Sequence, residues 1–158
     1  MSLPKLYLET TIPSYLTARR SRDLQRASDQ QATEDWWNLH RQHYECFVSA
    51  AVLDEVQRGD PTFAAARLAA LRGIRILPET VGIVELARRL LSERIIPMVA
   101  AEDAAHIAYA AGHGIEFLLT WNCTHINNPH LLRRIERACA AVGFRCPVIC
   151  TPAELVLP

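Results

Sequence analysis

The sequence alternates short apolar runs with longer amphipathic segments along its whole length, and this alternation restricts its fold more than any other feature. The apolar runs are typical of buried strands and cover residues 3–8, 45–49, 74–77, 117–120 and 146–150. Strands that alternate with helices predict a parallel sheet with helices on both faces. We therefore expect an α/β protein built on a five-stranded parallel sheet.

Helical signals fill the intervals between these runs. Ile83, Leu86, Ala87 and Leu90 recur at helical spacing and form one apolar stripe. Pro61 and Pro129 each follow a capping residue, and proline is preorganised for the first turn of a helix. We expect a turn at residues 9–14, either a basic loop or a frayed helix start at 17–28, and a helical pattern from about residue 29.

Length and charge limit the class of protein further. The 158 residues suit one domain, residues 1–158, and Lys plus Arg balance Asp plus Glu at 17 each. This balance gives no overall attraction for nucleic acid, so any phosphate-binding surface needs local arginine clusters.

The sequence also carries signals about its compartment. It has no apolar run long enough for a transmembrane helix and no secretory signal pattern at its start, so we expect a cytoplasmic protein. Its five cysteines are an odd number in mostly apolar settings, which favours reduced thiols over a disulfide framework. They include no Cys-x-x-Cys pair, which argues against a zinc site.

Four polar residues follow strands or begin helices in a way that directs them to one edge of the sheet. Glu9 leaves the first strand, Glu55 lies on the helix after the second, Asp103 opens the helix before the fourth, and Asn122 follows the fourth. Ligands of open parallel sheets bind at the carboxyl ends of the strands. Three carboxylates and one amide offer oxygen ligands that suit Mg²⁺ or Mn²⁺.

Each of these residues also has an ordinary structural explanation. Glu9 and Glu55 are compatible with a cap or a solvated surface group, and the helix dipole favours Asp103 in a first turn. Asn122 has the place of a turn residue. Only the joint pattern of the four indicates a site.

Four segments carry a resemblance to a known family. In chain order they are residues 7–16 (YLETTIPSYL), 48–56 (VSAAVLDEV), 103–108 (DAAHIA) and 118–126 (LLTWNCTHI). Together they resemble the four motifs of PIN domains, the last one in the Trp-Asn form of one bacterial branch. The resemblance spans nearly the whole chain.

The resemblance implies a PIN-like three-layer sandwich and the activity of a VapC-like toxin. Such a toxin is a Mg²⁺- or Mn²⁺-dependent endoribonuclease, a homodimer, and often the partner of a small antitoxin in a type II toxin–antitoxin pair. Glu9 and Asp103 are then expected to hold the cation directly, and Glu55 and Asn122 to act through waters or a second ion.

Further residues have supporting roles in this hypothesis. Thr10 and Thr120 are expected to donate hydrogen bonds to the carboxylates or to a phosphate, although strand-end hydroxyls also bond to local backbone. The RNA is expected to contact a cluster of arginines, for which the alternative is a solvated charged loop. The cluster consists of Arg19, Arg20, Arg22 and Arg26.

Two departures from the family pattern leave other functions open. The first acid is usually Asp but is Glu9 here, and the fourth is usually Asp but is the neutral Asn122. Three negative charges in place of four weaken metal binding. One alternative is therefore a non-catalytic PIN-like binding module with a degenerate metal site. Another is an α/β protein unrelated to nucleic acid, whose acidic residues are surface groups.

Histidines and tryptophans near these motifs complete the expectations. His106 is expected to be packed and hydrogen-bonded, and His125 to brace the loop that carries Asn122. Trp36 and Trp37 are about 100° apart on a helix, so one is expected in the core and the other at a patch for a homodimer or an antitoxin. The alternative is that the arginine-rich loop covers the second tryptophan.

Overall fold

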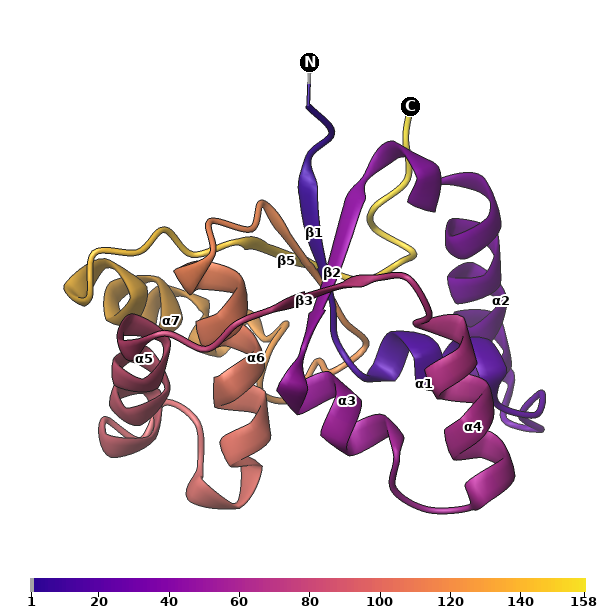
Figure 1. Cartoon of the computed structure of the whole chain (residues 1–158), viewed down its shortest axis with the longest axis horizontal. Coiled ribbons are helices and arrows are strands. Elements are labelled where there is room, and N and C mark those ends of the chain that lie inside the picture. The colour runs from indigo at the N-terminus through magenta and orange to yellow at the C-terminus, as the bar shows by residue number, and fades with distance from the viewer. Residues whose placement is uncertain (1) are drawn as a thin grey trace.

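The computed structural model describes residues 2–158 and has a five-stranded sheet at its centre (Figure 1). The strand order is β3-β2-β1-β4-β5, and every neighbouring pair is parallel. The expected α/β fold with a five-stranded parallel sheet is therefore confirmed. The strands are β1 (Lys5–Leu8), β2 (Glu45–Ser49), β3 (Arg75–Leu77), β4 (Phe117–Leu119) and β5 (Val148–Cys150).

Seven α-helices and two short 3₁₀-helices connect the strands. They are α1 (Thr11–Thr17), α2 (Leu24–Leu39), η1 (Arg41–His43), α3 (Ala50–Val56), α4 (Pro61–Ala70), α5 (Val81–Ser92), η2 (Met98–Ala100), α6 (Ala101–Gly112) and α7 (Pro129–Ala141). None of the described helices is long and apolar enough to cross a bilayer.

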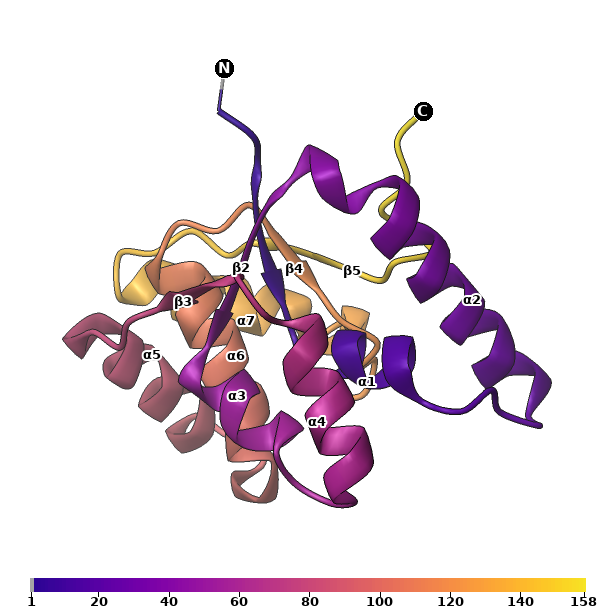
Figure 2. The same cartoon turned by 45° about the vertical axis from the view of Figure 1, so that its right-hand side comes forward.

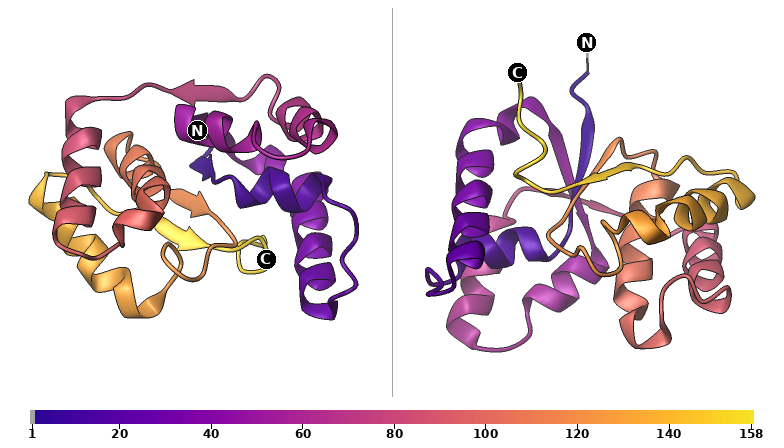
Figure 3. Two further views of the ribbon diagram at one scale, coloured as in Figure 1. Left: turned by 90° about the horizontal axis from the view of Figure 1, so that it is seen from below. Right: turned by 180° about the vertical axis from the view of Figure 1, so that it is seen from behind.

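The helices form two outer layers around the sheet. Figures 2 and 3 show α1, α2 and α4 on one side of the sheet and α5, α6 and α7 on the other. Parallel crossovers are right-handed, so the helices change face when the strand order changes direction after β3. The result is the expected three-layer arrangement with β1 in the middle.

The core lies along the two central strands and α6. Leu6, Tyr7 and Leu8 of β1 are fully buried, because helices cover both faces of this strand. Small residues let α6 approach its neighbours closely: a Cβ added at Gly112 would lie 2.5 Å from Cγ1 of Ile83 on α5. The five cysteines are free thiols, as the sequence predicted.

The register of the strands fixes which residues meet at the carboxyl edge. Leu8, the last residue of β1, pairs with Leu119, the last residue of β4. The next backbone N–H, that of Glu9, donates to the Leu119 carbonyl at 3.1 Å. Glu9 and Thr120 therefore leave adjacent strands at the same level.

The structure corrects one expectation near the N-terminus and decides between two others. Residues 9–14 are not simply a turn, because α1 begins at Thr11 and continues through Pro13 to Thr17. Proline is tolerated in a first turn, where the backbone N–H has no helical partner. The basic segment contains a helix start: α2 begins at Leu24, because the Asp23 side chain caps it by accepting from the Arg26 N–H at 2.8 Å.

The two adjacent tryptophans of α2 divide as predicted. Trp36 is fully buried against Tyr44, whereas Trp37 is half-buried. The side chain over Trp37 is Arg41, whose guanidinium carbon lies 4.4 Å from the ring centroid. This cover comes from η1 and not from the arginine-rich segment at residues 17–28.

Candidate active site at the carboxyl edge of the sheet

The four predicted site residues lie on segments that meet at the carboxyl edge. Glu9 follows β1 and is 3% exposed, while Glu55 on α3, Asp103 in the first turn of α6 and Asn122 after β4 are half-buried. Hydrogen bonds between side chains connect these segments.

Glu9 is held by the hydroxyls of two threonines. Thr11 Oγ1 donates to Glu9 Oε1 at 2.5 Å, and Thr120 Oγ1 donates to the same oxygen at 2.6 Å. The Thr11 backbone N–H donates to the other oxygen at 3.2 Å. Burial raises the pKa of the Glu9 carboxyl above its ordinary value, although the charge of His106 and the hydroxyl donors act in the opposite direction.

Glu55 forms a pair with a buried histidine. Its Oε1 contacts Nε2 of the fully buried His106 and accepts from Thr10 Oγ1 at 2.9 Å. Burial alone would raise the pKa of Glu55, but the hydrogen bond and charge of His106 outweigh it and lower that pKa. Burial would likewise lower the pKa of His106, but Glu55 and the charge of Glu9 raise it. Both directions fit an ionised carboxylate beside an imidazolium.

The other side of the His106 ring is anchored in the core. Nδ1 of His106 lies 2.8 Å from the hydroxyl of Tyr7, and that hydroxyl lies 2.6 Å from Oγ of Ser49. Tyr7 and Ser49 belong to β1 and β2 and are fully buried. The imidazole therefore has a fixed orientation from both nitrogens, in agreement with the packed and hydrogen-bonded histidine that the sequence predicted.

Asp103 pairs with His125, which lies on the loop after β4. Nδ1 of His125 is 2.8 Å from Oδ2 of Asp103. Asn122 holds this loop, because its Oδ1 accepts from the backbone N–H of His125 at 3.0 Å and of Thr124 at 3.2 Å. The amide oxygen of Asn122 thus acts as a turn-forming group. His125 makes two contacts: its backbone N–H bonds to Asn122 within the loop, and its ring contacts Asp103.

The threonines join these pairs into one network. Thr120 Oγ1 donates to Glu9 and accepts from the Asn122 N–H at 2.9 Å, so it links the first and fourth candidates. Thr10 bonds to Glu55, and both threonines predicted to support carboxylates do so. The negative charges of Glu9, Glu55 and Asp103 each raise the pKa of His106, and Glu55 is the carboxylate in contact with its ring.

Sequence reasoning left several members of this network out of the site. Thr11, Tyr7 and Ser49 carried no signal beyond their positions at strand ends. His106 and His125 were noted, but their carboxylate partners were not. Helical spacing between Asp103 and His106 was the one available hint.

A divalent cation fits the donor chemistry of this edge, although the direct ligands are few. Within residues 2–158, no set of three or more His, Cys, Asp and Glu side chains is arranged to hold a metal ion. Mg²⁺ commonly binds through one or two carboxylates and keeps several waters. Glu9 and Asp103, the two predicted ligands, match this mode in number and in oxygen chemistry.

The predicted arginine cluster lies beside the site and not within the acidic network. Arg19 lies over the ring of Phe63, Arg20 pairs with Glu34 at 3.1 Å, and Arg22 is exposed. Arg26 lies over Tyr15, whose ring stacks on that of Trp121, the neighbour of Asn122. A different arginine, Arg58, stands next to the acids and pairs with Glu102 at 2.6 Å.

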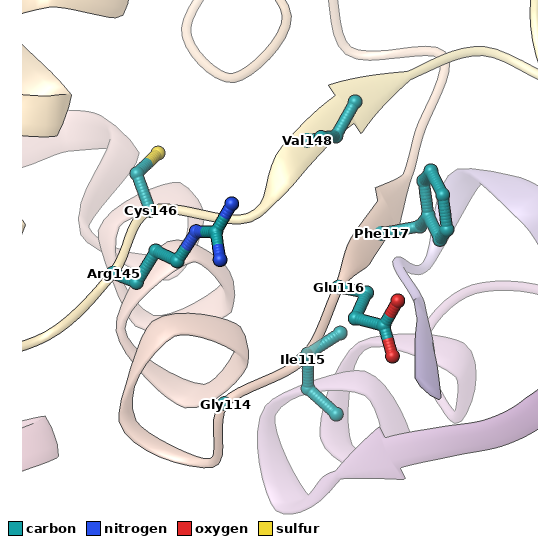
Figure 4. A pocket seen from close by; sticks show the side chains of 7 residues that line it. All are labelled: Gly114, Ile115, Glu116, Phe117, Arg145, Cys146 and Val148. Atoms are coloured by element: carbon teal, nitrogen blue, oxygen red, sulfur yellow. The ribbon is translucent and has the colours of Figure 1, made fainter. Parts of the chain in front are cut away.

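The molecule has a pocket at the opposite edge of the sheet. Figure 4 shows its lining by residues that precede β4 and β5 and by the first residue of each strand, and its volume is about 270 Å³. Arg145 and Glu116 are the charged side chains in its wall. This pocket lies at the amino ends of the strands and therefore contains none of the site candidates.

Fold and site together define a three-layer α/β protein with a carboxylate network at the carboxyl edge of its sheet. The sequence model of the PIN domain matches residues 6–122, and the chain belongs to the PIN domain family. This match extends from the start of β1 to Asn122 and so includes all four candidates.

The fold also resembles a solved structure. A chain in the crystal structure of VapBC2 from Rickettsia felis, bound to a DNA fragment from its promoter, is similar with a TM-score of 0.60 and 15% sequence identity. The similarity covers 92% of this chain and 97% of that one, so the two share a fold over nearly their full lengths. No curated protein matches this sequence.

Proposed function

We propose that this protein is a metal-dependent endoribonuclease and the toxin of a type II toxin–antitoxin pair, of the VapC type and the Trp-Asn branch. The observation that supports this most is the hydrogen-bonded network at the carboxyl edge that holds Glu9, Glu55 and Asp103. Membership of the PIN domain family, in which nucleases generally depend on divalent metals, supports it as well.

The roles of the residues follow from their contacts. Glu9 and Asp103 would hold Mg²⁺ or Mn²⁺, and Thr11, Thr120 and His125 keep their carboxylates in place. When bound, the cation lowers the pKa of a water ligand and neutralises charge on the scissile phosphate. Without this neutralisation the three carboxylates would repel the RNA backbone.

Glu55 is the group that would orient a water near the phosphate. Its pKa is lowered by His106, so the carboxylate stays ionised at neutral pH and accepts hydrogen bonds. Thr10 fixes the rotamer of Glu55 by its bond to Oε1. Asn122 shapes the loop that carries His125, and its role in catalysis is therefore indirect.

Contacts to the RNA and to partner proteins belong to the same proposal. The exposed cluster of Arg19, Arg20, Arg22 and Arg26 would contact the RNA backbone beside the acids. A small VapB-like antitoxin is the proposed partner, since the similar structure from Rickettsia felis is that of VapBC2. The half-buried Trp37 is the proposed centre of a homodimer contact, which light scattering of wild type and Trp37→Ser would test.

The decisive experiment is cleavage of a labelled RNA with Mg²⁺ or Mn²⁺, with EDTA as control. We expect cleavage by wild type in the presence of metal and none by Asp103→Asn, which removes a charge without changing shape. A folded wild type that binds Mn²⁺ and RNA but cleaves no RNA would support the non-catalytic binding module. The engagement of the Asn122 oxygen by its own loop is the observation that favours this second function.

A further inference from the structure

An ion pair joins the two segments that carry Glu55 and Asp103. Nη2 of Arg58 lies 2.6 Å from Oε1 of Glu102. Arg58 comes three residues after Glu55, and Glu102 immediately precedes Asp103 in the first turn of α6. This pair therefore joins the guanidinium of Arg58 to the first turn of α6, directly before Asp103.

The side chains of this pair are exposed, whereas the backbone beneath Arg58 is fixed. The side chain of Arg58 is 62% exposed and that of Glu102 is 44% exposed. Arg67 on α4 clamps the end of α3, because its Nε donates to the Val56 carbonyl at 2.9 Å and its Nη2 to the Arg58 carbonyl at 2.6 Å. Arg58 thus presents an exposed guanidinium from a stretch of backbone to which Arg67 is hydrogen-bonded.

Exchange of partners by Arg58 is physically easy. Exposed ion pairs contribute little to stability, so Glu102 is readily displaced. A phosphate has two oxygens that can accept the paired hydrogen bonds of a planar guanidinium, as a carboxylate does. An RNA phosphate that approaches the acids needs a nearby cation, and Arg58 is the arginine next to Glu55.

We propose that Arg58 binds a phosphate of the RNA next to the scissile bond, and that Glu102 holds the guanidinium until RNA displaces it. This inference rests on the proposed function, since it assigns the phosphate contact of the same site. It differs from the arginine cluster at residues 19–26, which contacts Phe63, Glu34 and Tyr15 and not the acidic network.

The test measures binding and not cleavage. Fluorescence anisotropy of a labelled single-stranded RNA is recorded in EDTA at several salt concentrations. One phosphate contact on a single strand contributes about 0.7 to the slope of log affinity against log salt, or about five-fold in affinity at about 0.1 M salt. Arg58→Ala should therefore reduce the slope by about 0.7 and the RNA affinity by about five-fold, and Arg58→Lys should reduce both by less.

The matched control is the ion pair at the opposite edge of the sheet. Arg75 and Glu45 are the first residues of β3 and β2, and their side chains pair at 2.8 Å with similar exposure. Arg75→Ala should leave RNA affinity unchanged. Equal effects of Arg58→Ala and Arg75→Ala would overturn the inference, as would a wild type that binds no RNA.

The second part of the test removes the ion pair between Glu102 and Arg58. Glu102→Gln should raise RNA affinity several-fold, and Glu102→Gln combined with Arg58→Ala should bind like Arg58→Ala alone. A fall in affinity on Glu102→Gln would contradict the restraining role of Glu102. If Arg58 governs RNA binding but wild type cleaves no RNA with Mn²⁺, the nuclease proposal fails and the phosphate contact stands.

Discussion

Nδ1 of His125 lies 2.8 Å from Oδ2 of Asp103 and thereby joins the loop after β4 to the first turn of α6. The loop holds the ring in this place because Asn122 accepts the backbone N–H of His125. The segment that provides a fourth carboxylate in the usual family pattern thus provides an imidazole that orients the third. Removal of a partner that orients a metal ligand typically lowers metal affinity or activity by about 10- to 100-fold.

His125→Ala should therefore lower both Mn²⁺ affinity and RNA cleavage by about 10- to 100-fold. His125→Asn should retain more function than His125→Gln, because an asparagine amide can replace the nearer ring nitrogen. Isothermal titration with Mn²⁺ and cleavage rates measure the two effects. His130→Ala is the control, since this exposed side chain has no part in the network. Normal metal affinity in His125→Ala would show that the pair is only structural.

Thr120→Val should destabilise the fold as well as the site. The buried hydroxyl donates to Glu9 and accepts from the Asn122 N–H, so its loss leaves both groups without that partner. We expect a loss of about 1–3 kcal/mol in the free energy of unfolding, measured by urea denaturation. Thr124→Val, at an exposed position of the neighbouring loop, should cost much less.

Glu9→Gln should abolish cleavage and change the pH dependence of stability. The pKa of Glu9 is raised in the folded state, so its contribution to stability is complete below the unfolded pKa and is lost as pH rises through the folded pKa. As the pH rises from 4 to 8, the melting temperature of Glu9→Gln should therefore increase relative to that of wild type. The opposite trend would mean that the hydroxyl donors and His106 outweigh burial.

Asn122→Asp should keep the fold and maintain or raise cleavage. A carboxylate oxygen can accept the same two backbone N–H groups that the amide oxygen accepts, at 3.0 and 3.2 Å, so the loop should not change. The added negative charge should strengthen cation binding. Titration with Mn²⁺ and cleavage rates check this, and a decrease in both would show that the missing charge is not what limits the site.

The sequence predicted the fold better than the details of the site. Apolar runs located all five strands, because a strand buried on both faces needs an uninterrupted apolar stretch. The helix α1 was missed because Pro13 indicated a turn, although proline fits a first turn equally well. Strand order and register were beyond sequence patterns, since pairing depends on segments far apart in the chain.

For the polar network, the sequence predicted the positions of the acids but not their partners. The positions of Glu9, Glu55 and Asp103 follow from where strands end and helices begin. The partners of these acids do not, because an imidazole at a given position has several directions in which to point, and packing selects one. The place of Arg58 was not predicted for the same reason: it lies just beyond the end of α3, and its contact with Glu102 depends on how α3 and α6 pack.

The central place of β1 in the sheet has a consequence for the order in which the acidic edge assembles. Glu9 accepts a hydrogen bond from Thr120, which is 111 residues further along the chain. Pairings over such separations form late in folding. A nascent chain that already contains Glu9 and Glu55 still lacks β4, Thr120 and His125. The acidic edge can therefore assemble only after β4 and the loop that follows it have been synthesised and have joined β1 in the sheet.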